Sequence, residues 1–490
     1  MLIFLIIFSI FFICLSLVKP KWALACVIFG LPTYLIRFRI WFMPLTLLEA
    51  MILILFAVWA IRSIGSWRLP PPWRGPAVAG KIKNCPWKWL LLAWLLVSAL
   101  AIAVSPDKAA ALGIWKAYFL EPILLFIVFT DIVNGKKDLN LVFGALGLSA
   151  LAVSLYAIVQ KFTGWGIVNP FWEAAATRRI TSFFEYPNAV GLYLAPIVVL
   201  LAGYFLSPPS FLKNFGWKRA IVVCFALCVI CLSVLAIVFA QSEGALAGLA
   251  GGALVLILFG IIGRAGGRIR KAAVIAFVLI VVFSAVYPFL VLKFSDPYQA
   301  VNFQNPLVGY LCQKATFRDL SGAIRQEQWR ETWFMLKDGG RWLRGAGLSG
   351  YQETLKPYHQ EGIFYNFDND PDFRRKIVIF NEKYKAAHWQ PVEIFLYPHN
   401  IILNFWSELG LVGLIVFILI TIKFFRRGFR KITLGHSPLA ISCIAAMAAL
   451  LVHGLVDVPY FKNDLAVLFW LVAGLMAVAE KDKEICVSLK

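Results

Sequence analysis

Residues 397–414 read YPHNIILNFWSELGLVGL, where a long polar segment runs into an apolar one. Pro398 marks the entry to a helix, because proline is tolerated at the start of a helix and not inside it. His399 is therefore expected at the mouth of a membrane helix, where a neutral imidazole can take up a proton at ordinary pH. Glu408 lies inside the apolar run, where a carboxylate is costly and usually has a function. An interfacial histidine that caps the helix and a glutamate paired to a neighbour account for the stretch equally well.

Composition places the chain among membrane proteins. Of its 490 residues, 61% are hydrophobic and 15% are charged, whereas soluble domains carry about a quarter charged residues. Apolar runs long enough to cross a bilayer recur along the sequence and predict an all-α polytopic membrane protein. We expect 12 or 13 transmembrane helices, because only Lys19-Pro20-Lys21 separates the first two runs. The runs cover residues 2–18, 22–36, 44–61, 89–104, 111–133, 141–160, 189–206, 219–240, 244–263, 272–292, 401–422, 438–457 and 463–479.

The net charge of +21 is distributed in a way that indicates topology. Basic residues cluster in alternate connections, and the positive-inside rule places such connections in the cytoplasm. Residues 62–88 and 423–437 are predicted inside, and the nearly charge-balanced segment 293–398 outside. The sequence has no basic stripe with interleaved aromatic residues, so nucleic acid is not an expected partner. The predicted parts are N-terminal transmembrane helices over 1–292, a large extracytoplasmic loop over 293–398 and C-terminal transmembrane helices over 399–490.

Two loop features fall on the same predicted outer face as His399. One is the segment that contains Arg178 and Arg179 and ends at Asn188, directly before an apolar run. The other is a helical pattern in the large loop, which carries Arg325 and Arg330. Ser321 could cap this helix, Gly339-Gly340 could end it, and Trp329, Trp333 and Leu336 form its apolar stripe. Such a helix is expected to pack flat on the membrane core and to point its arginines toward it.

Arginines beside a membrane cleft suit phosphate or pyrophosphate ligands, because guanidinium binds these groups bidentately and stays charged. At the outer membrane surface the natural ligand of this kind is a lipid-linked pyrophosphate. His399 would then activate an acceptor hydroxyl. Arginines that are simply solvated in loops remain the simpler alternative.

Three patterns together resemble the O-antigen ligase and polymerase family. The first is Arg-x-Thr-x-x-Phe…Pro-Asn, from Arg179 to Asn188. The second is Arg…Trp…Gly-x-Gly in the large loop, and the third is the His-Asn…Glu-x-Gly of the opening stretch. The third is the most specific, and the resemblance covers residues 100–460.

The resemblance implies a bundle of the membrane glycosyltransferase (GT-C-like) type in the bacterial cytoplasmic membrane, with a large periplasmic loop and an active site that faces the periplasm. The implied donor is a glycan on undecaprenyl pyrophosphate, the acceptor is a glycan or a lipid, and the loop histidine His399 is the catalytic base. No metal or cofactor is implied. The arginines expected to hold the pyrophosphate are Arg178, Arg179, Arg325 and Arg330, and the expected supporting residues are Asn188, Asn400 and Glu408.

One departure and two alternatives stay open. Where the family usually has Ser-Arg-Gly between two spans, this chain has Ser242-Glu243-Gly244, so another arginine substitutes or the substrate differs. A ligase and a polymerase use the same donor and differ in the acceptor, so the resemblance fits both. A transporter of small anions is the alternative from a different class, because charged residues lie in apolar segments. These are Glu49, Lys116 and Glu121.

Overall fold

The computed structural model describes residues 2–41, 43–65, 87–205, 217–262, 309, 312–314, 316–379, 381–434 and 437–481. Within these ranges the chain is almost entirely helical, and six helical stretches are long and apolar enough to cross a bilayer. The expectation of an all-α polytopic membrane protein is thereby confirmed. The predicted span 272–292 lies outside the described residues, so the total of 12 or 13 spans stays a prediction. The six stretches are Lys108–Ile132, Lys136–Thr163, Pro187–Phe205, Ala220–Ala240, Ile401–Thr433 and Asn463–Lys481.

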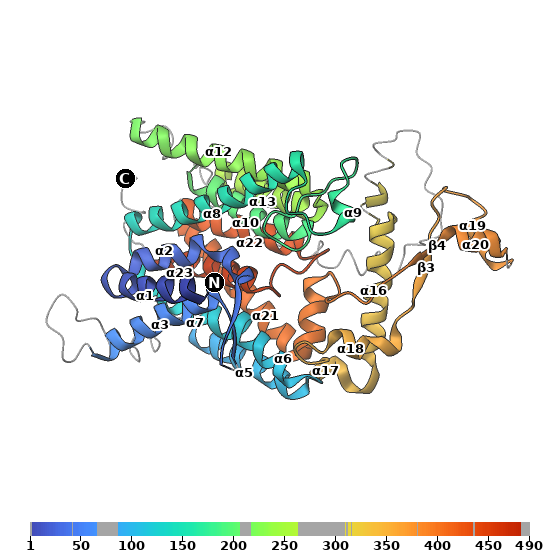
Figure 1. Ribbon diagram of the computed structural model, residues 1–490, viewed down its shortest axis with the longest axis horizontal. Coiled ribbons are helices and arrows are strands. Elements are labelled where there is room, and N and C mark those ends of the chain that lie inside the picture. Colours follow the sequence, from blue (N-terminus) through green and yellow to red (C-terminus); the bar gives the residue numbers. More distant parts are fainter. Residues whose placement is uncertain are drawn as a thin grey trace.

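Most of the helices run side by side as a bundle (Figure 1). A small antiparallel hairpin of β1 (Arg37–Ile40) and β2 (Met43–Thr46) interrupts the N-terminal part. The bundle elements before the large loop are α1 (Leu2–Val18), α2 (Pro20–Phe29), η1 (Leu31–Leu35), α3 (Leu47–Gly65), α5 (Lys88–Val104), α6 (Lys108–Ile114), η2 (Trp115–Leu120), α7 (Glu121–Ile132), α8 (Lys136–Thr163), α9 (Pro170–Glu173), α10 (Pro187–Phe205), α12 (Trp217–Ala240) and α13 (Glu243–Ile262). Those after it are α21 (Ile401–Leu434), α22 (Pro438–His453) and α23 (Asn463–Lys481).

Small residues let α10, α13 and α22 approach closely, as is common between membrane helices. A Cβ on Gly191 of α10 would lie 2.5 Å from the Cβ of Ala245 in α13. A Cβ on Gly252 of α13 would lie 2.7 Å from a methyl group of Val199 and 3.1 Å from the carbonyl oxygen of Ala445 in α22. This packing sets the start of α10, the start of α13 and the end of α22 against one another at one end of the bundle.

The described residues between 316 and 398 form what we call the outer module, because most of it lies outside the helix bundle (Figure 1). Its helix α16 runs across the end of the bundle, while the bundle helices run toward that end (Figure 1). The predicted cap was wrong, because the helix begins after Asp319 and Ser321 lies inside it. The elements of the module are α16 (Leu320–Lys337), η3 (Asp338–Gly340), α17 (Arg341–Arg344), α18 (Tyr351–Leu355), η4 (Lys356–Tyr358), β3 (Gly362–Phe364), α19 (Phe373–Val378), α20 (Glu382–His388) and β4 (Trp389–Pro391), with β3 and β4 paired antiparallel.

Helix α21 is broken at Gly410, which has φ +69° and ψ −177°. A side chain at this position would overlap the carbonyl oxygen of Leu343 in α17. Glycine is required because it alone adopts this conformation without strain and leaves room for the neighbouring backbone. The outer module therefore packs directly against the backbone of α21.

Candidate functional site

His399 lies in a tightly held turn directly before α21. Its φ of +46° is unusual for a residue with a side chain, and such strain is often found at functional positions. The side-chain oxygen of Asn400 accepts hydrogen bonds from the backbone N–H groups of Ile402 and Leu403 at 3.0 and 3.1 Å. Asn400, which was expected only as a supporting residue, thus caps the start of α21.

Helix α16 holds the two residues before His399. The indole N–H of Trp329 donates to the carbonyl oxygen of Pro398 at 2.8 Å. The side-chain amide of Gln328 donates to the carbonyl oxygen of Tyr397 at 2.8 Å. The outer module therefore fixes the backbone that presents the imidazole.

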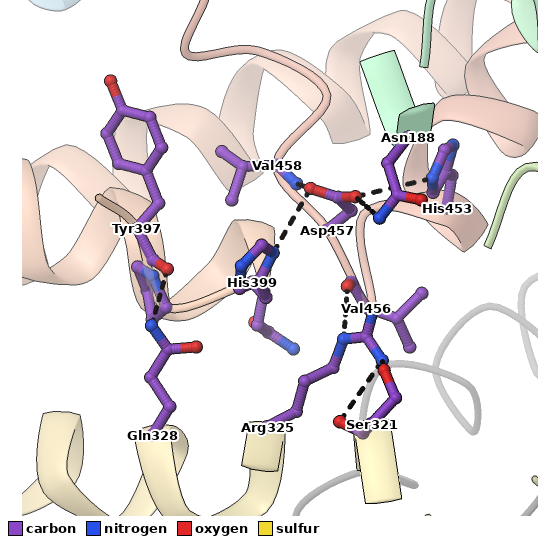
Figure 2. Close-up of polar contacts among 12 residues, drawn as sticks. Asn188, Ser321, Arg325, Gln328, Tyr397, His399, His453, Val456, Asp457 and Val458 are labelled. Carbon is purple, nitrogen blue, oxygen red and sulfur yellow. Dashed lines mark hydrogen bonds and ion pairs between the residues drawn. The ribbon is translucent and has the colours of Figure 1, made fainter. Parts of the chain in front are cut away.

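Asp457, in the loop between α22 and α23, faces His399 (Figure 2). Imidazole Nδ1 lies 3.5 Å from the Oδ1 atom of Asp457, which is ion-pair range without a well-aligned hydrogen bond. His453, at the end of α22, approaches the other carboxylate oxygen at 3.9 Å. Burial alone would raise the pKa of the Asp457 carboxyl, but His399, His453 and Arg325 hold that pKa well below its usual value. Asp457 is therefore an anion beside the imidazole.

Sequence reasoning missed Asp457. The signal was the spacing His453-x-x-x-Asp457 at the end of an apolar run. That spacing places two titratable groups together at the membrane surface, but it does not reveal that His399 faces them.

Asn188 connects Asp457 to Arg179. Its side-chain N–H donates to Asp457 at 3.2 Å, and its side-chain oxygen accepts from Arg179 at 3.2 Å. Arg179 also donates to the carbonyl oxygens of Ala240 and Gln241 at 3.1 and 3.3 Å. Burial lowers the pKa of Arg179, Glu243 opposes this shift, and Arg325 adds to it. The two guanidinium groups are thus within electrostatic range of each other.

His399, Asp457, Asn188 and Arg179 form a polar cluster. Arg325 reaches this cluster from α16 (Figure 2). It donates to the carbonyl oxygen of Val456 at 3.1 Å and to the side chain of Ser321. Within the described residues, neither Arg325 nor Arg179 forms an ion pair with a carboxylate. Both guanidinium groups are held by neutral oxygens and keep N–H groups for an external anion.

Arg178 and Arg330 are not part of this cluster. Arg178 donates to the carbonyl oxygens of Glu173 and Lys161 at 2.9 and 3.1 Å. Arg330 pairs with Glu327 of the same helix at 2.8 Å. Of the four arginines considered for the site, only Arg179 and Arg325 reach the surroundings of Asp457, Arg179 through Asn188 and Arg325 through the backbone of Val456.

Glu408 lies away from the cluster and holds the outer module. Its carboxylate is 1% exposed and accepts a hydrogen bond from the backbone N–H of Ser349 at 2.9 Å. Glu243 pairs with Lys314 at 2.8 Å. In the remaining cluster of charges in apolar segments, Lys116 lies 3.2 Å from Glu49 and 3.8 Å from Glu121. These three charges therefore pair among themselves.

One structural observation and one comparison with known proteins bear on what the residues around His399 and Asp457 do. Among the described residues, no group of three or more histidine, cysteine, aspartate or glutamate side chains is arranged to hold a metal ion. Residues 226–418 match the family model described as O-antigen ligase.

Over these residues the chain is similar to the O-antigen ligase family. The resemblance noted in the sequence is thereby confirmed. The matched range contains Arg325 and His399, whereas Arg179, Asn188 and Asp457 lie outside it. No curated protein matches the chain.

Proposed function

We propose that this protein is a membrane glycosyltransferase of the O-antigen ligase type. It moves a glycan from undecaprenyl pyrophosphate to an acceptor hydroxyl at the outer face of the bacterial cytoplasmic membrane. The observation that carries the proposal is the convergence of His399, backed by the Asp457 carboxylate, with two unpaired arginines. This set supplies a base for the acceptor and cations for the leaving group.

Arg179 and Arg325 are assigned to the pyrophosphate. As the bond between the anomeric carbon and the phosphate oxygen breaks, negative charge grows on the leaving group, and fixed cations stabilise it. Guanidinium groups suit this task because they form paired hydrogen bonds to phosphoryl oxygens. Neutralisation of the leaving group removes the need for a separate acid at that oxygen.

His399 is assigned to the acceptor. An ionised carboxylate can only accept a hydrogen bond, so Asp457 favours the tautomer in which Nδ1 carries the proton. Nε2 is then free to take the proton of the acceptor hydroxyl while that oxygen attacks the anomeric carbon. One carbon–oxygen bond forms, the bond to the lipid pyrophosphate breaks on the opposite face, and the configuration inverts.

The test is transfer by the purified full-length protein in nanodiscs. The donor is lipid-linked glycan extracted from a strain that lacks this protein, and the acceptor is that strain's lipid fraction. We expect glycan on the acceptor and an equal amount of released undecaprenyl pyrophosphate. If neither product exceeds its amount in a blank without protein, the proposal is overturned.

The deletion strain itself separates the ligase from the polymerase. Finished polymer that accumulates on its lipid carrier indicates a ligase. Loss of long polymer, with single repeat units remaining, indicates a polymerase.

Asp457→Asn should lower kcat by about 10- to 10³-fold, which is part of the 10²–10⁴-fold contribution of a general base. The amide keeps the shape of the carboxyl but no longer selects the imidazole tautomer, so the KM values of both substrates should change little. Steady-state kinetics with each substrate varied in turn measure this. A parent-like kcat would remove Asp457 from the mechanism.

The same variant has a predicted pH signature in stability. A carboxyl group whose pKa is depressed by folding stabilises the protein above its ordinary pKa of about 4 and loses that contribution as pH falls through the folded value. Asp457→Asn should therefore have a lower Tm than the parent at pH 7. The difference should shrink below about pH 4, as measured by thermal melts in detergent. A difference that persists unchanged at pH 3 would contradict the assignment of Asp457 as an anion.

A further inference from the structure

A second cluster of polar groups lies beside the His399 site and is not used by the proposed mechanism. We call it the Lys462 niche, and it consists of Tyr34, Phe184, Tyr186, Lys462 and Asp464. The ammonium group of Lys462 lies over three aromatic rings, at 5.2, 5.0 and 4.9 Å from their centroids. The residue Lys462 as a whole is partly buried.

The side-chain polar groups of the niche form neither an ion pair nor a well-aligned hydrogen bond among the described residues. Lys462 forms no ion pair or hydrogen bond through its side chain there. The Tyr34 hydroxyl and both carboxylate oxygens of Asp464 are buried and have no hydrogen-bond partner. Tyr34 is 6% exposed and Asp464 is 1% exposed. Unmet buried polar groups are costly and are usually satisfied by water or a ligand.

The niche adjoins the His399 site. Tyr186 comes two residues before Asn188, and Lys462 comes five residues after Asp457, so these two segments contribute to both. The ring of Tyr397, two residues before His399, lies 5.5 Å from that of Phe461. The charge of Asp457 also acts on Lys462. The niche and the His399 site are therefore close neighbours.

The chemistry of the niche selects the ligand. Lys462 can only donate hydrogen bonds, the Asp464 carboxylate can only accept them, and the Tyr34 hydroxyl can do both. A phosphoryl group offers acceptors alone and would face the Asp464 carboxylate, and a hydrocarbon offers neither. Neighbouring hydroxyls of a sugar donate and accept together, and the C–H faces of its ring suit aromatic walls.

We propose that Lys462, Asp464 and Tyr34 form a sugar-binding subsite that holds a residue of the glycan beside the one that reacts at His399. This inference rests on the proposed function and adds its substrate-recognition part. The bound sugar belongs either to the donor glycan or to the acceptor, and the kinetics distinguish the two.

The kinetic experiment uses Lys462→Gln, Asp464→Asn and Tyr34→Phe in the full-length protein. Loss of a charge-assisted hydrogen bond should raise the KM of one substrate about 10- to 100-fold in the first two, and loss of a neutral one about 2- to 10-fold in Tyr34→Phe. The kcat should stay within about threefold of the parent, because base and cations are intact. A raised donor KM places the sugar on the donor, and a raised acceptor KM places it on the acceptor.

The matched control is Lys376→Gln in the outer module. Lys376 also lies over a tyrosine ring, at 5.3 Å from the centroid of Tyr384, but it is paired with Asp370. Its KM values should match the parent. If Lys462→Gln fails to fold, Tyr34→Phe decides, because it keeps every ring. If Lys462→Gln and Asp464→Asn fold and their KM values are unchanged, the subsite is overturned. If those two variants do not fold, an unchanged KM in folded Tyr34→Phe overturns it.

A binding measurement separates this inference from the proposed function. His399→Ala protein is treated with an amine-acetylating reagent, with and without the extracted lipid-linked glycan, and acetylation of Lys462 and Lys376 is quantified by mass spectrometry. Protection of Lys462 alone supports a donor sugar in the niche even if no transfer is detected. Transfer by the parent, together with no protection and unchanged KM values, overturns the niche and leaves the proposed function standing.

Discussion

His399→Ala protein is expected to transfer glycan about 10²–10⁴-fold more slowly than the parent, which is the usual contribution of a general base. The imidazole is the group that can take the acceptor proton, and its Nδ1 atom already faces Asp457 at 3.5 Å. Binding of the lipid-linked donor should be nearly unchanged, because Arg179 and Arg325 are intact. Single-turnover rates and equilibrium binding of the extracted donor measure the two effects separately.

His388→Ala is the matched control, since its imidazole lies 3.2 Å from the carboxylate of Asp368 in the outer module. A folded His388→Ala protein should transfer at close to the parent rate. The double variant of His399 and Asp457 should be no slower than His399→Ala, because residues that act as one unit are not additive. A well-expressed His399→Ala protein with parent activity would end the assignment of the base.

Arg179→Ala and Arg325→Ala are each expected to lower kcat/KM by about 10²–10³-fold, which is typical of the loss of a fixed group that stabilises transition-state charge. Both guanidinium groups are held by neutral oxygens and lie within electrostatic range of each other. Lysine replacements should recover only part of the activity, because an ammonium group cannot form the planar pair of hydrogen bonds. Initial rates over a range of donor concentrations give the values.

Arg178→Ala and Arg330→Ala supply controls of the same residue type. Arg178 is held by the backbone oxygens of Lys161 in α8 and Glu173 in α9, and Arg330 is held by Glu327. Both variants should stay within about threefold of the parent, as expected for substitutions away from the reacting groups. A loss in these two that equals the loss in Arg179→Ala and Arg325→Ala would mean that the pyrophosphate site lies elsewhere.

Features that depend on nearby residues could be predicted from the sequence. The apolar runs predicted the membrane class, and Pro398 placed His399 at a helix entry that the structure shows. The sequence also held part of the information needed to choose between Arg325 and Arg330 as the site arginine. They are five residues apart and so lie on different faces of a helix, and Arg325 precedes the buried Trp329 by four residues, on its side of α16.

Features that depend on distant residues could not be predicted. Asp457 faces His399 across 58 positions of the chain, and only the packing of α21 against α22 and α23 brings them together. Arg178 and Arg179 are neighbours with equal propensities, yet only Arg179 lies within reach of Asn188 and Ala240. The Lys462 niche combines segments from the start, middle and end of the chain, which no local pattern reveals.

The break at Gly410 has a consequence for protein engineering. Residues 401–409 are fastened to the outer module, because Trp406 donates to the carbonyl oxygen of Trp342 at 2.7 Å and Glu408 accepts from Ser349. A chimera that grafts the outer module of a homologue onto this bundle should therefore have its C-terminal junction at Gly410. Hydropathy alone would place the junction at residue 398. A junction there separates the grafted module from the residues of 401–409 that hydrogen-bond to it, and His399 then lacks the neighbours that belong with it. Natural recombination between members of the family would be subject to the same constraint. Exchanged segments should therefore include the outer module together with the first turns of α21, up to Gly410.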